Sequence, residues 1–218
     1  AAPTILEACR SAGVRRAVFV GTTAIFTQLN ASSKVVRQAA ESAITSSSLD
    51  TTILRPTMIY GTPGDRNMIR LVRWLDRWPV IPVFGNGRSL QQPVHVSDVA
   101  WAVVRVLEEK ATIGRQFNIS GAAPLIYNEV VRLAAKALGR RIQRLHIPAS
   151  PIVATLQASE RLGLTLPIKA EQILRLNEHK AFPHTEAAGA FGYSPMAFEE
   201  GIRQEVALFR SGADALSL

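Results

Sequence analysis

The 218-residue sequence contains a single cysteine, Cys9, so it can form no internal disulfide and offers no cysteine-based zinc site. No apolar run approaches the roughly 18 residues that a helix needs to cross a bilayer. The first residues show neither the basic stretch nor the apolar core of a secretory signal. These absences favour a reducing, cytoplasmic setting. The content of 47% hydrophobic and 19% charged residues is typical of a globular protein.

Negative charge is also sparse, because 17 Asp and Glu stand against 25 Lys and Arg, a formal net charge of +8. The densest group of arginines has the spacing of one helical face and surrounds Trp74 and Trp78; it consists of Arg66, Arg70, Arg73 and Arg77. We interpret it as the solvated face of a surface helix, with a phosphate-binding patch as the alternative. No zinc finger, RNA-recognition signature or aromatic-glycine repeat is present, so the sequence does not favour nucleic acid as a partner.

Helices and strands alternate in the first third of the chain. Residues 3–12 predict a helix that ends at Gly13, and residues 17–20 form the uniformly apolar run of a strand buried on both faces. Residues 32–46 predict a second helix, and residues 51–55 a second strand. The apolar stripe of the second helix consists of Val35, Val36, Ala39, Ala40, Ala43 and Ile44. This alternation is typical of a parallel sheet with helical crossovers.

Beyond residue 61 the pattern is looser. Short extended segments at 80–83 and 93–96 flank a Gly-Asn-Gly turn. Ser97 is the expected N-cap of the helix that follows, with Asp98 in its first turn. Further on we expect strands at 117–119 and 142–147 and helices at 128–138 and 198–209.

Five segments are informative as an ordered set: GVRRAVFVGTTAIF (13–26), SSKVVRQAAESAI (32–44), LDTTILRPTMIYG (49–61), QQPVHVSDVAWAV (91–103) and FNISG (117–121). In order and spacing they resemble the extended and atypical short-chain dehydrogenases, the NAD-dependent epimerase/dehydratase family. The resemblance implies an α/β fold: the C-terminal portion of a doubly wound Rossmann-type parallel sheet plus a small, mostly helical substrate-binding part. Residues 1–60 would carry strands five and six of the family order. Residues 61–218 would form the substrate-binding part, interleaved with the last sheet strand at about 91–121.

In that family the fold begins with a strand, a glycine-rich turn and a helix, whose backbone amides hold the dinucleotide phosphates. Neither G-x-G-x-x-G nor G-x-x-G-x-x-G occurs in these 218 residues. We therefore expect an N-terminally truncated sequence whose full-length parent binds NAD or NADP, and no tight dinucleotide binding by these residues alone. The alternative is that another chain covers the apolar strand at 17–20, which would otherwise be an exposed sheet edge.

The resemblance also implies catalytic residues. The family uses a Tyr as acid and base, a Lys four residues later that holds the nicotinamide ribose, and a Ser or Thr that binds the reacting oxygen. Lys34 fits the lysine, and Thr23 fits the hydroxyl residue, with Thr22 beside it. The tyrosine position holds Asn30, whose amide has no proton to exchange near neutral pH. Lys34 can equally be a surface helix lysine, and the threonines can be hydroxyls that satisfy local backbone donors.

A second segment, LRPTMIYG, resembles the part of the family whose backbone contacts the nicotinamide amide. The implied cofactor-binding residues are Thr22, Lys34, Pro56, Thr57, Met58 and Ile59. Pro56 also has a structural interpretation, as the residue that terminates a strand.

Substrate-binding residues follow from the QQPVHVSDVA segment. Gln91 stands where sugar-nucleotide enzymes of the family commonly have an arginine that clamps the diphosphate in bidentate fashion. Arg88 is a nearby substitute, and His95 completes the implied set. A proton relay between His95 and Asp98 is one reading of their proximity; we favour a strand residue and a helix-start carboxylate. The segment is more similar to atypical members, including the complex I accessory subunit with this fold.

Two functions stay open. The leading one is an NAD(P)-dependent epimerase, dehydratase or reductase acting on a small carbonyl or sugar-like substrate, with catalysis impaired or altered by Asn30. The alternative is a non-catalytic dinucleotide-binding sensor or assembly subunit. No metal site is expected, because His179 and His184 have no third ligand near them in the sequence. The residues that distinguish NAD from NADP would precede Ala1, the substrate is undecided, and a homo-oligomer stays open.

Overall fold

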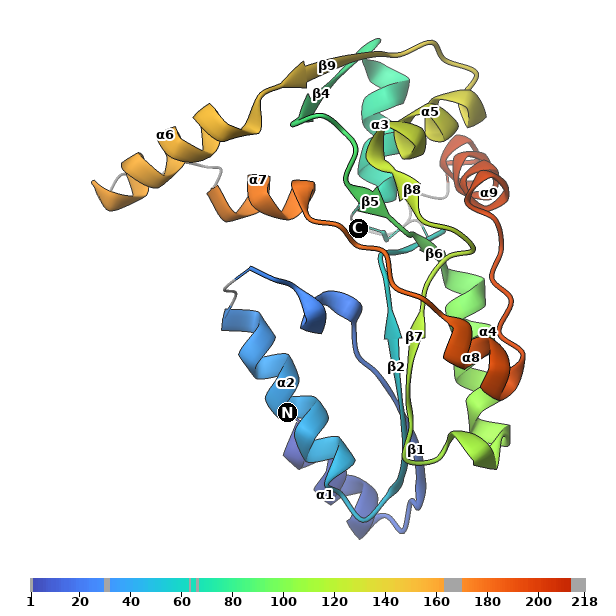
Figure 1. Cartoon of the computed structure of the whole chain (residues 1–218). Helices are drawn as coiled ribbons and strands as arrows, with labels where there is room; N and C mark the ends of the chain where they lie inside the picture. The colour runs from blue at the N-terminus through green and yellow to red at the C-terminus, as the bar shows by residue number, and fades with distance from the viewer. Residues whose placement is uncertain (1, 30–31, 63, 66, 163–169, 213–218) are drawn as a thin grey trace. The chain divides into compact units, whose positions relative to one another are not determined.

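The computed structural model (Figure 1) describes residues 2–29, 32–62, 64–65, 67–162 and 170–212. The chain folds into two compact units. Unit 1 comprises Ala1–Ile59, Gln92–Ala123 and Phe182–Phe198, and unit 2 comprises Tyr60–Gln91, Pro124–Ala181 and Glu199–Leu218. Each unit therefore combines segments that are far apart in the sequence.

Unit 1 is built on a parallel sheet in the order β1-β2-β7, made of β1 (Arg16–Val20), β2 (Asp50–Pro56) and β7 (Gln116–Ile119). Val20 is in register with Leu54, and Pro56 with Ile119. The carboxyl ends of the three strands therefore lie at the same edge of the sheet.

Helices cover both faces of this sheet (Figure 1). The helices α1 (Ala2–Ser11) and α2 (Ser32–Thr45) pack on one face, where Ile53 of β2 is buried. On the other face, α4 (Val96–Glu108) and α8 (Thr185–Phe191) enclose its neighbour Leu54. Successive strand residues point to opposite faces, so each β-strand contributes side chains to the hydrophobic cluster on either face of the sheet. This confirms the doubly wound Rossmann-type architecture. The short elements β3 (Ile59–Tyr60), β6 (Val94–His95), η1 (Thr23–Phe26) and η2 (Lys110–Thr112) connect these segments.

The predicted apolar stripe of α2 is wrong in its first half. Val35 and Val36 are 66% and 69% exposed, whereas Ile44 is buried against Leu6 of α1 and Ile53 of β2. The helix itself was predicted correctly. Its stripe is only half buried because, among the described residues, the α1 and β2 contacts reach only its last turns.

The outer edge of β1 is unpaired among the described residues, since β1 is hydrogen-bonded to β2 alone. Its last residue, Val20, is 52% exposed. An apolar sheet edge favours association with other chains. We expect Val20→Lys to reduce light scattering of the concentrated protein while changing the free energy of unfolding by no more than about 0.5 kcal/mol. Val18→Lys is the control, because Val18 packs on the core and its replacement must destabilise the fold; undiminished scattering of the Val20 variant would contradict the prediction.

Unit 2 contains two strand pairs. The strand β4 (Val80–Phe84) pairs in parallel with β9 (Gln143–Ile147), and β5 (Leu90–Gln91) pairs antiparallel with β8 (Leu125–Ile126). Its helices are α3 (Met68–Arg77), α5 (Tyr127–Ala137), α6 (Ala149–Arg161), α7 (Ala170–Asn177) and α9 (Phe198–Arg210), the last of which begins in unit 1.

The helix α3 buries its apolar face and exposes the arginine face predicted from the sequence. Arg70, Arg73 and Arg77 are exposed, and the Arg77 guanidinium lies over the Trp78 ring, 5.5 Å from its centroid. Arg66 lies outside the described residues.

Candidate functional site

The candidate site lies at the carboxyl edge of the unit 1 sheet, the edge where ligands bind in open parallel sheets. Thr22 and Thr23 follow β1, and Thr57 follows β2. The Thr23 hydroxyl donates to the Pro56 carbonyl at 3.3 Å, and the Thr57 amide donates to the carbonyl of Ile119 at 3.0 Å. The ends of β1, β2 and β7 are thereby tied together. The predicted site residues Thr22, Thr23, Pro56 and Thr57 therefore lie at this edge.

Gln92 fastens the same edge from a different segment. Its carbonyl accepts the Thr57 hydroxyl at 2.5 Å, and its amide nitrogen donates to the Gly121 carbonyl at 2.7 Å. Its amide oxygen accepts the Phe182 N–H at 2.9 Å. The side chain is buried. Gln92 could not be predicted from the sequence, because only its neighbour Gln91 stands at a position where the family pattern changes.

Lys34 closes the turn that follows β1. Thr22 caps the short helix η1, since its hydroxyl accepts the Ala24 amide at 3.2 Å. The Lys34 ammonium group donates to the carbonyl of Thr27 at 2.7 Å. The lysine of α2 and the threonine turn are therefore placed beside each other. Asn30 lies outside the described residues.

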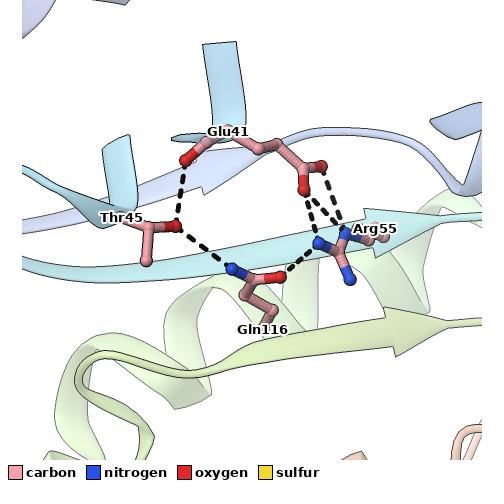
Figure 2. A network of polar contacts seen from close by, with 4 residues as sticks. All are labelled: Glu41, Thr45, Arg55 and Gln116. Atoms are coloured by element: carbon pink, nitrogen blue, oxygen red, sulfur yellow. Dashed lines mark hydrogen bonds and ion pairs between the residues drawn. The ribbon is translucent and has the colours of Figure 1, made fainter. Parts of the chain in front are cut away.

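A buried ion pair sets α2 against the sheet (Figure 2). The Arg55 guanidinium of β2 binds the Glu41 carboxylate of α2 through Nε at 3.0 and 3.1 Å and through Nη2 at 2.5 Å. Arg55 also binds Gln116 of β7, whose amide nitrogen donates to the Thr45 hydroxyl at 3.1 Å. Gly21 lies beside this pair, and a side chain there would come within 2.9 Å of the Glu41 carboxylate. The network holds the helix that carries Lys34.

Hydrogen-bond donors gather at this edge of the sheet. The Thr22 and Thr23 hydroxyls and the Lys34 ammonium group are donors suited to a ribose and a carboxamide. A pyrophosphate needs successive backbone amides, usually on a glycine turn of positive φ at a helix start. Among the described glycines with positive φ, none lies between β1 and α2. The described residues between β1 and α2 therefore offer no such turn.

Tyr193 is the tyrosine of unit 1, and its hydroxyl is hydrogen-bonded to the backbone. Its hydroxyl donates to the Ser120 carbonyl at 3.1 Å, and burial, followed by the charge of Asp98, raises its pKa well above the usual range. The Ser120 hydroxyl is 2.9 Å from Nδ1 of His184, and burial lowers the pKa of that imidazole. The phenol is therefore held protonated and hydrogen-bonded within unit 1.

The predicted substrate residues do not form one cluster within either unit. Arg88 and Gln91 belong to unit 2, and His95 belongs to unit 1. Arg88 is exposed and lines a cavity, whereas Gln91 is buried. His95 is also buried and accepts the Ser97 amide at Nδ1, so the N-cap of α4 is His95 and the predicted Ser97 cap is wrong.

Lys180, a residue that the sequence did not single out, lies beside Gln91. The two residues form a β-bridge, and the Lys180 amide donates to the Leu90 carbonyl at 2.7 Å. Burial lowers the pKa of the Lys180 ammonium group, which donates to the Arg175 carbonyl at 2.7 Å. Almost ninety residues separate these partners in the sequence, so no local pattern could reveal the pair.

The parallel sheet, its two helical layers and the threonine edge define a Rossmann-type domain. A family model described as "NAD dependent epimerase/dehydratase family" matches residues 2–120. The chain belongs to the NAD dependent epimerase/dehydratase family.

Three known proteins illustrate the similarity. NADH dehydrogenase [ubiquinone] 1 alpha subcomplex subunit 9, mitochondrial, of Arabidopsis thaliana is 24% identical, covering 81% of this chain and 44% of that protein. The 2-alkyl-3-oxoalkanoate reductase of Stenotrophomonas maltophilia is 25% identical, covering 92% of this chain and 70% of that protein. The solved structure of MoeE5 in complex with UDP-glucose and NAD has a TM-score of 0.74 and 21% identity, covering 97% of this chain and 70% of that one. The chain thus spans less than half of the first relative, and the last similarity shows the fold alone.

The described part of the chain contains no group of three or more His, Cys, Asp or Glu residues arranged to hold a metal ion. Within the same residues, no helix is long and apolar enough to cross a membrane.

Proposed function

We propose that this chain is the nicotinamide-facing and substrate-binding portion of an NAD(P)-dependent protein that acts on a small carbonyl or sugar-like substrate. The observation that carries the proposal is the convergence of Thr22, Thr23, Thr57 and Lys34 at the carboxyl edge of the sheet. Membership of the family supports the cofactor class. The nicotinamide supplies or accepts a hydride when bound.

Each residue at this edge has a distinct proposed role. Lys34 holds the nicotinamide ribose by a charge-assisted hydrogen bond, once its ammonium group leaves the Thr27 carbonyl. Thr22 and Thr23 orient the reacting oxygen of the substrate. The backbone of Pro56, Thr57, Met58 and Ile59 borders the carboxamide; the Met58 carbonyl already accepts the Val94 amide at 3.0 Å, which fixes that stretch.

Replacement of Lys34 tests this assignment. In the full-length protein, Lys34→Met is expected to weaken NADH or NADPH binding about tenfold, the loss of one charge-assisted hydrogen bond. Lys34→Arg should retain most of the affinity, and Lys110→Met, an exposed lysine of η2, should leave it unchanged. Calorimetric titration measures all three. Equal affinities of the Lys34→Met variant and the unaltered protein would remove Lys34 from the site.

The alternative is a non-catalytic dinucleotide-binding sensor or assembly subunit. It is favoured by the amide at position 30, by the commitment of Tyr193, and by the similarity to a protein named as an NADH dehydrogenase subunit. The two functions differ in one measurement: saturable cofactor binding without turnover of any carbonyl compound supports the alternative, and robust turnover by the unaltered protein eliminates it. The cytoplasmic setting stays a prediction.

A further inference from the structure

A cavity of about 740 Å³ lies wholly within unit 2, where the parallel strands β4 and β9 end. Its volume is typical of small-molecule sites. Three segments line it: the turn after β4, the start of α5, and the stretch from β9 into α6. The lining residues are Gly85, Asn86, Arg88, Ile126, Asn128, His146, Pro148, Ala149 and Ser150.

The cavity is electropositive. Among the residues that the structure describes, no Asp or Glu lines it, and no carboxylate pairs with the exposed Arg88. Unit 2 contains 16 Lys and Arg against 10 Asp and Glu, so 16 minus 10, or +6, of the chain's net charge of +8 belongs to it. The cap residues of α5 and α6, Ile126 and Pro148, make no side-chain hydrogen bond to the first turn of either helix. The N-terminal dipole of α6 therefore adds to the positive field of Arg88, whereas the first amides of α5, those of Tyr127 and Asn128, already bind the carbonyls of Ser89 and Gly87.

The wall around Arg88 is preorganised. The Asn128 side chain donates to the Asn86 carbonyl at 3.1 Å and lies 3.2 Å from Nε2 of His146. The Arg88 amide donates to the Asn86 side chain at 2.9 Å. Gly87 has a φ of +66°, and a side chain there would lie 2.3 Å from the Asn128 amide oxygen. The turn therefore holds one conformation, and little ordering entropy opposes ligand binding.

Another part of the lining is apolar. Ile126 is partly exposed, and Pro148 and Ala149 continue the hydrocarbon surface at the start of α6. A ligand that contacts both the charged and the apolar parts of this lining would carry a negative head group and a hydrocarbon chain.

We propose that this cavity binds an amphipathic anion, with its carboxylate or phosphate head on Arg88 and His146 and its chain against Ile126, Pro148 and Ala149. The inference goes beyond the proposed function: Arg88 is a residue that the sequence predicts for substrate binding, and unit 2 would contribute an anion-binding site of its own. A fork of guanidinium donors suits either head group.

Titration of the 218-residue chain with octanoate and with octyl phosphate, without any cofactor, tests the proposal. Saturable calorimetric heats are expected with at least one of them, and the tighter of the two identifies the head group. Octanol, which lacks the charge, and acetate and inorganic phosphate, which lack the chain, should each bind at least tenfold more weakly. Equal affinity of octanol and octanoate, or of inorganic phosphate and octyl phosphate, would overturn the proposal.

Variants locate the site. Arg88→Gln should weaken binding of the charged ligand at least tenfold, and Arg88→Lys should recover part of the loss; Arg203→Gln removes an exposed charge of α9 and should change nothing. Ile126→Asn should remove the preference for the longer chain, which keeps the test valid if an Arg88 variant misfolds. Unaltered binding by folded Arg88→Gln refutes the site. The proposed function fails separately, because its own test measures dinucleotide binding at Lys34.

Discussion

Replacing Glu41 by Ala is expected to lower the free energy of unfolding by about 3–5 kcal/mol, because the change leaves the Arg55 guanidinium charged and unpaired in a buried position. The two side chains are only 10% and 15% exposed. Arg55 would retain Gln116, whose neutral amide cannot compensate a charge. Chemical denaturation measures the effect.

Two comparisons isolate the cause. Glu7→Gln breaks an ion pair of similar length, 2.7 Å, that is solvent-exposed, so it should cost less than about 1 kcal/mol. The double variant Glu41→Met with Arg55→Met removes both charges and should recover most of the loss. If the Glu41 and Glu7 variants lose the same stability, the network of Figure 2 does not hold α2 on the sheet.

Replacing Asn30 by Tyr is expected to raise the rate of NADPH-dependent carbonyl reduction by the full-length protein about 10²–10⁴-fold, the usual contribution of a positioned acid or base. The phenol would supply the proton that the amide cannot, four residues before the lysine on α2. Absorbance of the reduced cofactor, followed with a panel of small carbonyl compounds, measures the rate.

Asn30→Phe is the matched control, since it adds the ring without the hydroxyl. Its rate should equal that of the unaltered protein. A Tyr variant no faster than the Phe variant would mean that catalysis is not limited at position 30, which contradicts the assignment of Asn30 to the tyrosine position of the family.

Local patterns predicted the sheet of unit 1 well. The apolar run that became β1 and the β-branched run that became β2 are short and bounded by Gly or Pro, so they had one interpretation. The parallel pairing followed from the helix between them. The threonine edge was predictable for the same reason, because residues that follow parallel strands meet at one edge.

Contacts between distant segments were beyond that reasoning. The stripe of α2 predicted burial of Val35, but burial depends on which elements reach the helix, and those contacts are not encoded in its own period. Gln92 and Lys180 acquire partners from segments far along the chain. The Glu41–Arg55 pair joins a helix position that reads as polar and solvated to the next strand. In Gln92 and Glu41, a residue type that usually lies at the surface is buried because its polar group is satisfied.

Whether the carboxyl edge of the unit 1 sheet binds the nicotinamide end of the cofactor is best tested by titrating the 218-residue chain with NADH. Backbone and side-chain NMR shifts follow the titration. We expect weak binding, with a dissociation constant of about 1 mM or more, and shift changes confined to Thr22, Thr23, Lys34 and Thr57 and their neighbours. Micromolar affinity, or shift changes that leave this edge of the sheet untouched, would contradict this expectation.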